Sequence, residues 1–211
     1  RTNGFRVLAA LALLAACFLA GRAGLRGNDA PVNDPRYQQP AAEVAFGQVA
    51  TIENPRSGRV ITVESGGSIQ SAVLAAAPGD TIHVRPGTYH ETVYIDKDGI
   101  ALSGSIEGGE WPRLDGEGTL NDAILYSGNG ITIENFEITR YKGNGVMGQA
   151  GNNFVIRNNI IIDAGVYGIF PQFGQNCLIT NNVLSGIADA AIYVGMSENI
   201  HVAHNEVFGN V

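Results

Sequence analysis

Large apolar side chains, two of them aromatic, recur at one spacing in the second half of the chain. Met147, Phe170 and Tyr193 follow one another at a constant spacing of 23, and Tyr167 is close by in the sequence. Residues that repeat at a fixed spacing stack in a row when each repeat forms one turn of a coil. Exposed aromatic rings bind the apolar faces of sugar rings, and they also pack beneath covering loops. Tyr167, Phe170 and Tyr193 are therefore candidate substrate-binding residues, with packing under a loop as the alternative.

Acidic residues in the same region are few. Abstraction of a proton beside a carboxylate is assisted by a positive charge on that carboxylate, and clustered carboxylates can hold a calcium ion that supplies it. No two acids here fall one repeat apart, so no cofactor or metal site is visible, and Ca²⁺ is expected only if its ligands lie in coils beyond Val211. Asp189, which shares a repeat with Tyr193, is the candidate catalytic residue. The acids of the regular repeats are Glu134, Glu137, Asp163, Asp189, Glu198 and Glu206.

Two further groups of residues carry chemistry in other proteins. His201, His204 and Glu206 lie close together near the end of the sequence and could form part of a metal or proton-transfer site. We favour turn and surface roles for them, because no residue that would orient them is identifiable. Cys177 belongs to a row of apolar residues, so we expect a buried core thiol rather than a nucleophile.

A regular repeat with a period of 23, running from Ile131 to Val211, must position these side chains. Within each repeat, apolar and polar residues alternate, which is the pattern of a β-strand rather than of a helix. A period in this range indicates a solenoid in which each repeat forms one coil stacked on the next. The sequence therefore predicts an all-β solenoid. The segments in register are 131–135, 154–158, 177–181 and 200–204.

Polar residues also follow this period. Asn159, Asn182 and Asn205 form one row. Asparagine tolerates left-handed backbone angles at a turn, and its amide can bond the same amide one coil along. A polar ligand site is the alternative, but a structural asparagine ladder explains every member of the row without a ligand. Opposite charges one repeat apart, which stabilise register, are Glu134 with Arg157 and Arg140 with Asp163.

The segment before the regular repeats predicts several strands and one helix. Ser68 is a suitable N-cap for a helix that ends before Pro78, and Ile69, Val73 and Leu74 share one face of it. We expect this helix to cover the N-terminal end of the solenoid core. Short strands are predicted at 59–63, 81–84, 92–95 and 99–104, and an irregular loop at 105–118.

The first residues have the features of a secretory signal. Arg1 and Arg6 precede a run of about ten apolar residues, which is too short to span a bilayer stably. Leu14-Ala-Ala-Cys17 resembles the lipobox of bacterial lipoproteins, which implies cleavage before Cys17 and lipid on its sulfur. An ordinary signal peptide or a short anchor helix is the alternative. We expect residues 1–16 to be a signal peptide, 17–57 a flexible tether and 58–211 the solenoid domain.

Composition limits the partners of the protein. The 211 residues carry a formal net charge of −7, without the excess of Lys and Arg that nucleic-acid phosphates require. We expect a monomer with one compact domain, exported and held on a membrane through Cys17. Phe18, in place of an aspartate, favours the outer membrane. The chain stops partway through a coil at Val211, so we expect further coils after it.

From Arg59 onward the chain resembles the bacterial right-handed parallel β-helix family, the pectin-lyase-like superfamily. The resemblance implies a right-handed coil with three sheets. Similar proteins include lyases and hydrolases of pectin and other polyuronates, uronan epimerases, and repeat proteins with no known activity. Residues 87–91 also resemble the opening of pectin methylesterases, but one catalytic aspartate of those enzymes is absent, so Glu91 is expected to be a turn residue. The segments that carry the main resemblance are 68–70, 77–82, 86–91 and 191–195.

Two functions follow as expectations. The first is a cell-envelope lipoprotein whose β-helix binds or processes acidic polysaccharide, in the second case as a polysaccharide lyase, glycoside hydrolase or uronan epimerase. The second is a non-catalytic β-helix scaffold or binding protein. Fold analogy alone favours the first, whereas the lack of a recognisable catalytic set favours the second. The sequence leaves the question of enzymatic activity open.

Overall fold

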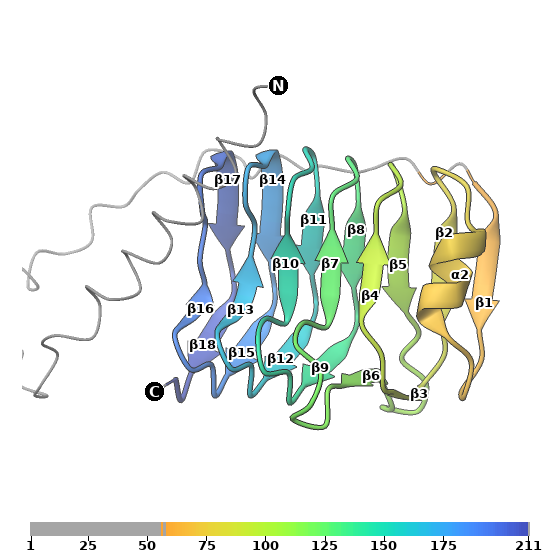
Figure 1. Cartoon of the computed structure of the whole chain (residues 1–211), viewed down its shortest axis with the longest axis horizontal. Helices are drawn as coiled ribbons and strands as arrows, with labels where there is room; N and C mark the ends of the chain where they lie inside the picture. Colours follow the sequence, from red (N-terminus) through yellow and green to blue (C-terminus); the bar gives the residue numbers. More distant parts are fainter. Residues whose placement is uncertain (1–55, 57, 211) are drawn as a thin grey trace, which may run out of the picture. The chain divides into compact units, whose positions relative to one another are not determined.

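The computed structural model describes residue 56 and residues 58–210. The expected signal peptide, the lipobox with Cys17 and all but the end of the expected tether lie outside the described residues. Among the described residues, no helix is long and apolar enough to cross a membrane. What is described forms a parallel β-helix, as the regular repeat predicts (Figure 1).

Three sheets, named A, B and C here, form the sides of this solenoid, and each regular coil adds one strand to each sheet in turn. Sheet A contains β1 (Val60–Val63), β2 (Thr81–Val84), β5 (Ala101–Gly104), β8 (Thr132–Glu134), β11 (Val155–Arg157), β14 (Gln175–Thr180) and β17 (Glu198–Ala203). Sheet B contains β3 (Gly87–Tyr89), β6 (Pro112–Asp115), β9 (Glu137–Thr139), β12 (Ile160–Ile162), β15 (Val183–Ser185) and β18 (Glu206–Phe208). Sheet C contains β4 (Val93–Ile95), β7 (Ile124–Tyr126), β10 (Val146–Gly148), β13 (Tyr167–Phe170) and β16 (Ala190–Ile192).

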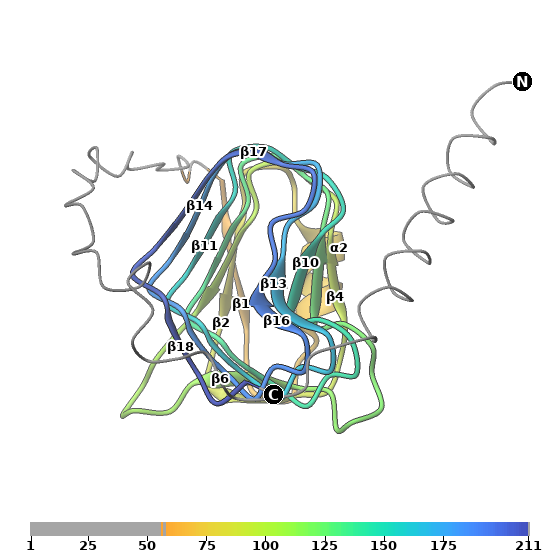
Figure 2. The ribbon, with the colours of Figure 1, turned by 90° about the vertical axis from the view of Figure 1, so that its left-hand side faces the viewer.

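The three sheets enclose an interior (Figure 2), and rows of apolar side chains fill it. In sheet A, Leu102, Ile133, Ile156 and Ile179 pair in register and are at most 1 % exposed. The rows of earlier coils that end in Ile200, Ile192, Val202 and Val207 are buried in the same way, whereas these four residues of the last coils are partly or fully exposed. Each residue gains its burial only against the coil beside it, so the coils stabilise one another cooperatively.

Asparagines form the predicted ladder where each coil passes from sheet A to sheet B. Asn159 Nδ2 donates to Asn182 Oδ1 at 3.0 Å, and Asn182 Nδ2 donates to Asn205 Oδ1 at 2.9 Å. Asn159 and Asn182 are 0 % exposed. The residue before each ladder position has the left-handed backbone expected of a sharp turn. These residues are Asn158, Asn181 and His204, with φ of 55°, 54° and 55°.

The predicted helix is α2 (Ile69–Ala75), and Ser68 is its N-cap. The helix packs against β1, β2 and β4 and buries Ile69, Ala72 and Val73. The expectation that Leu74 faces the core was wrong, because its side chain is 68 % exposed. Ala72 completes the buried face instead, at the i+3 position after Ile69.

Side chains from the following coil hold both ends of α2. The Glu91 carboxylate, between β3 and β4, accepts hydrogen bonds from the backbone N–H groups of Ile69 and Gln70 at 2.7 and 3.0 Å. A carboxylate at this position satisfies free N–H groups and complements the helix dipole. Lys97 Nζ donates to three carbonyls at the other end of the helix, at 2.8–2.9 Å. Glu91 is thus a turn residue, as expected, and also an anchor for α2.

Two expectations about the earlier coils need correction. Residues 105–118 are not wholly irregular, because β6 lies within them and pairs with β3 and β9. Arg140 pairs with Asp115 of β6, one coil back, rather than with Asp163. The other predicted charge pair is confirmed, with Arg157 Nε at 2.8 Å from Glu134 Oε2.

Candidate functional site

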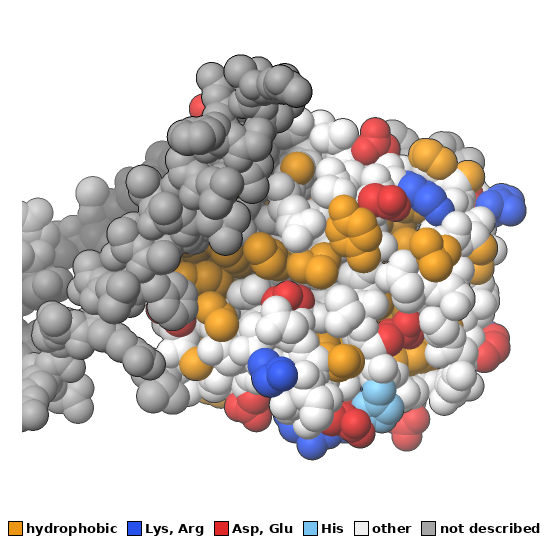
Figure 3. Space-filling model, in the orientation of Figure 1, with side chains coloured by type: hydrophobic (Ala, Val, Ile, Leu, Met, Phe, Trp, Pro, Cys, Tyr) orange, Lys and Arg blue, Asp and Glu red, His pale blue; other side chains and the backbone are white. Residues whose placement is uncertain are grey.

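An apolar row runs along the outer face of sheet C. The strand register places Leu125 beside Tyr94, Met147 beside Leu125 and Phe170 beside Met147. Tyr193 directly follows Ile192, which pairs with Ile169, and so continues the row. Hydrophobic side chains form a band across this face in the space-filling view (Figure 3). The row is two coils longer than the sequence indicated.

Three aromatic rings form a cluster at one end of this row. Tyr167 stacks on Tyr193 with ring centroids 5.0 Å apart and planes at 22°. Phe170 packs edge-on against Tyr167 at 4.7 Å and lies 5.1 Å from Tyr193. Tyr193 is 46 % exposed, whereas Phe170 is 7 % exposed. The structure thus brings the three candidate residues together, with Phe170 as support beneath two tyrosines. We call these three residues the ring cluster.

Asp189 lies beside the ring cluster, one coil after Val166, whose carbonyl accepts from the Asp189 N–H at 3.1 Å. Its side chain is exposed. Burial raises the pKa of the Tyr167 hydroxyl, and the nearby negative charge of Asp189 raises it further. Tyr167 is therefore protonated at neutral pH, and the pair presents a proton donor and a carboxylate side by side.

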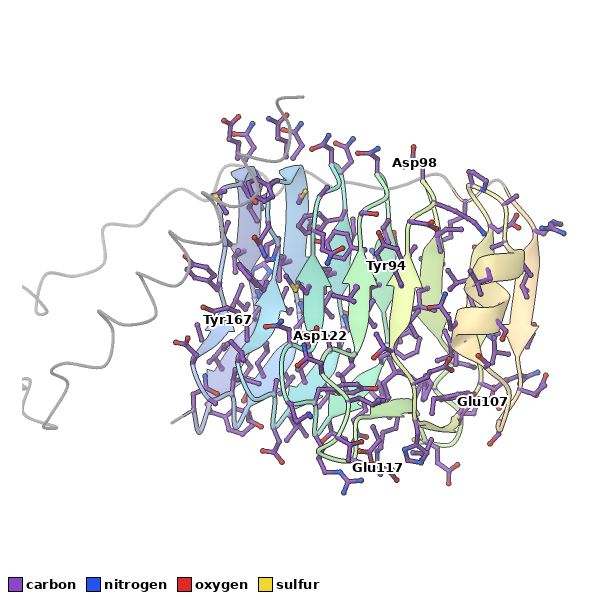
Figure 4. The ribbon with its side chains drawn as sticks, in the orientation of Figure 1. Tyr94, Asp98, Glu107, Glu117, Asp122 and Tyr167 are labelled. Carbon is purple, nitrogen blue, oxygen red and sulfur yellow. The ribbon has the colours of Figure 1, made fainter. Side chains whose placement is uncertain are left out.

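A hydrogen-bonded chain that the sequence did not reveal fixes the start of β13. The Asp122 carboxylate Oδ1 accepts from Asn144 N at 2.8 Å and from Asn144 Nδ2 at 2.7 Å. Asn144 Oδ1 in turn accepts from the N–H of Tyr167 at 3.2 Å. Figure 4 labels Asp122 and Tyr167 on neighbouring parts of this face. Asn144 is 8 % exposed, so it acts as a buried link that orients Tyr167.

Tyr94 marks the far end of the apolar row (Figure 4). Its side chain is 39 % exposed, and its hydroxyl is 3.0 Å from Ser127 Oγ. The side-chain amide of Gln70 in α2 bonds both backbone groups of Tyr94. Tyr94 N donates to Gln70 Oε1 at 2.6 Å, and Gln70 Nε2 donates to the Tyr94 carbonyl at 3.4 Å. The helix therefore closes the edge of sheet C at this end, which leaves the outer face of β4 open.

The other candidates do not form sites in the described part of the chain. No three His, Cys, Asp or Glu side chains there lie together as metal ligands would. His201, His204 and Glu206 are exposed in the last coil. Cys177 is 0 % exposed, and burial raises the pKa of its thiol to about 11, so it is the core residue expected.

A hollow of about 450 Å³ lies at the last coil. Its apolar lining includes Ile192, Val202 and Val207, which continue the inward rows of earlier coils. Residues at the matching positions of those coils are buried in the core. The hollow is therefore the end face of the solenoid core, and we do not treat it as a ligand site.

Comparison with known proteins gives one family and one structure. The family described as "Right handed beta helix region" matches residues 49–207. No curated protein matches the chain. A crystal structure of an alginate lyase from Paenibacillus sp. str. FPU-7 shares 17 % sequence identity, over 72 % of this chain and 75 % of that chain, with a TM-score of 0.38.

Proposed function

The chain belongs to the family of right-handed β-helix proteins, and from this premise we propose that its β-helix domain binds polysaccharide on the outer face of sheet C. The ring cluster of Tyr167, Phe170 and Tyr193 is the platform on which a sugar ring rests. One observation carries the proposal: two stacked tyrosines, one of them 46 % exposed, stand on a sheet face that no described helix or strand covers. Contiguous apolar patches on a protein surface often mark a site that contacts a partner.

The chemistry of the platform suits a sugar. A pyranose ring has an apolar face that packs on an aromatic ring, and hydroxyls around its edge that need polar partners. Asp189 lies beside the cluster, and its carboxylate and the two tyrosine hydroxyls can accept and donate such hydrogen bonds. The buried Asn144 holds the backbone of Tyr167 in place before any ligand arrives, which lowers the entropy cost of binding.

Replacing Tyr193 with alanine is expected to weaken glycan binding by about ten-fold, because ring stacking of this kind contributes roughly 1–1.5 kcal/mol. The measurement is isothermal titration of the wild-type and variant proteins with a panel of oligosaccharides that contains alginate, polygalacturonate and neutral glycans. Phe173→Ala is the matched control, since Phe173 is 55 % exposed and makes no ring contact with the cluster. Equal loss in both variants, or no loss in Tyr193→Ala, would contradict the proposal.

Processing of the bound glycan is a second candidate function. Asp189 and Tyr167 favour it, because they place a proton acceptor and a protonated donor together on the platform. Incubation with the same panel, followed for new reducing ends or unsaturated products, tests this. Turnover that Asp189→Asn removes while binding persists would support a lyase, hydrolase or epimerase. Binding without turnover of any glycan would leave the non-catalytic binding protein as the function.

We further propose that the protein acts at the cell envelope, held to a bacterial outer membrane by lipid on Cys17. The lipobox resemblance of residues 14–17 supports this. A Cys17→Ser variant, expressed with its signal segment, is expected to appear in the soluble fraction after cell lysis, whereas the wild-type protein sediments with membranes. Continued sedimentation of the variant with membranes would refute lipid anchoring.

A further inference from the structure

Every arginine of the described chain lies in an ion pair with a carboxylate, so none is free to bind a charged glycan. Arg59 lies 2.8 Å from Asp80, and Arg85 lies 2.6 Å from Glu107. All six arginines among residues 56 and 58–210 have such a partner. The remaining pairs are Arg56 with Glu134, Arg113 with Glu137, Arg140 with Asp115 and Arg157 with Glu134.

The two lysines of the described chain add little free positive charge. The ammonium group of Lys97 donates hydrogen bonds to carbonyls at the C-terminal end of α2. Lys142 is the only Lys or Arg in this part of the chain whose charged group has no carboxylate or carbonyl partner. It precedes Asn144 at the corner of sheet C, and the strands of sheet C themselves contain no charged residue. One unpaired lysine is thus the positive charge available in the described chain for a polyuronate, which carries one carboxylate per sugar.

Negative charge, in contrast, flanks the platform. Asp189 lies beside the ring cluster. Asp122 lies just before β7 of sheet C and accepts a hydrogen bond from Asn144. Three successive backbone hydrogen bonds, each between neighbouring coils, lead from Asn121 through Gly143 and Val166 to Asp189. The two acids are therefore three coils apart. At the spacing of parallel strands this is about 14 Å, too far for both carboxylates to hold one calcium ion.

We infer that the outer face of sheet C takes an uncharged polysaccharide and discriminates against polyuronates. This inference rests on the proposed function, and it changes the expectation of an acidic ligand. A uronate carboxylate at the ring cluster would meet Asp189 without a free guanidinium to offset the repulsion, on a chain whose net charge is −7. A neutral pyranose meets stacked tyrosines and a hydrogen-bond acceptor instead.

The experiment compares neutral glucan or mannan hexasaccharides with guluronate and galacturonate hexasaccharides, titrated into the full chain. The neutral ligand is expected to bind about ten-fold more tightly than either uronate, because the carboxylate of a uronate is repelled by Asp189. Its affinity should change less than about two-fold between low and physiological salt, because no ion pairs form. Tighter binding of a uronate, with or without added Ca²⁺, would overturn the inference while the proposed function stands.

Variants separate the two proposals. Asp189→Asn is expected to raise uronate affinity by about three-fold by removing repulsion, and Lys142→Gln should leave neutral-glycan affinity unchanged. If Lys142→Gln abolishes binding of the neutral glycan, the assigned contacts are wrong. Loss of neutral-glycan binding in Tyr193→Ala ties the selectivity to the ring cluster. Absence of binding to every glycan would refute the proposed function itself, and the charge inference with it.

Discussion

Replacing Asn182 with leucine is expected to lower the free energy of unfolding of the β-helix by roughly 3–5 kcal/mol. Asn182 is 0 % exposed, and all of its amide groups are bonded. Its Nδ2 donates to the carbonyl of Ile156 at 3.0 Å and to Asn205 Oδ1 at 2.9 Å. Its Oδ1 accepts from the backbone N and from Nδ2 of Asn159, at 3.1 and 3.0 Å. Leucine has the same branching and number of side-chain heavy atoms but leaves these buried partners unsatisfied, so the cost exceeds that of one hydrogen bond.

Urea unfolding followed by circular dichroism measures this loss as a shift of the transition midpoint. Asn181→Gly is the matched control, because Asn181 is adjacent, exposed and left-handed with φ of 54°. Glycine tolerates that backbone angle, so the control is expected to change stability by less than about 0.5 kcal/mol. Similar midpoints for Asn182→Leu and the wild type would show that the ladder contributes little beyond turn geometry.

The regular repeat explains why the fold was predictable. From Ile131 onward one constant offset, the same that separates Asn159 from Asn182, relates every coil to the next, so inward rows, ladder and turns follow from the sequence alone. The first coils do not keep that offset. Asp115 lies 25 residues before Arg140, and β6 sits inside a Gly-rich segment that hides its strand pattern. The pair of Arg140 with Asp163 was wrong for this reason.

The candidate site was predictable only where its residues follow the regular repeat. Phe170 and Tyr193 were found because they obey the repeat, and Asp189 because it shares their coil. Tyr94 pairs with Leu125, which lies further along the sequence than one regular repeat. Asp122 accepts a hydrogen bond from Asn144, which lies closer than one regular repeat. The stacking of Tyr167 on Tyr193 depends on side-chain directions, which a periodic pattern does not contain. The repeat predicted the position of the apolar row on the outer face of sheet C, whereas side-chain packing decides which rings are exposed there.

Lowering the pH from about 5 to about 2 is expected to destabilise the β-helix, with Asp80 making a large part of the difference. Asp80 is 2 % exposed, at the turn between α2 and β2. It accepts hydrogen bonds from the N–H groups of Ala77 and Arg59 and from the Arg59 guanidinium, each at 2.8 Å. The bond from Ala77 and then the Arg59 side chain lower the pKa of Asp80 from 3.8 to about 2.

The sign follows from proton linkage. A carboxyl whose pKa is lowered by folding binds a proton more readily in the unfolded chain, so it stabilises the fold above its unfolded pKa and loses that effect as the pH falls towards about 2. Urea unfolding at a series of pH values gives the number of protons taken up on unfolding. Asp80→Asn is expected to be less stable than the wild type at neutral pH and to take up about one proton fewer between pH 4 and 2.

Asp163→Asn is the control for this measurement, because Asp163 is an exposed acid that forms none of the ion pairs of the described chain. It should retain the acid-side fall in stability of the wild type. Asp115 and Glu134 also have pKa values lowered by arginine partners, so some dependence on pH persists in Asp80→Asn. An unchanged proton uptake in Asp80→Asn would mean that the turn before β2 opens before the rest of the β-helix unfolds, which would place the weakest coil at the N-terminal end.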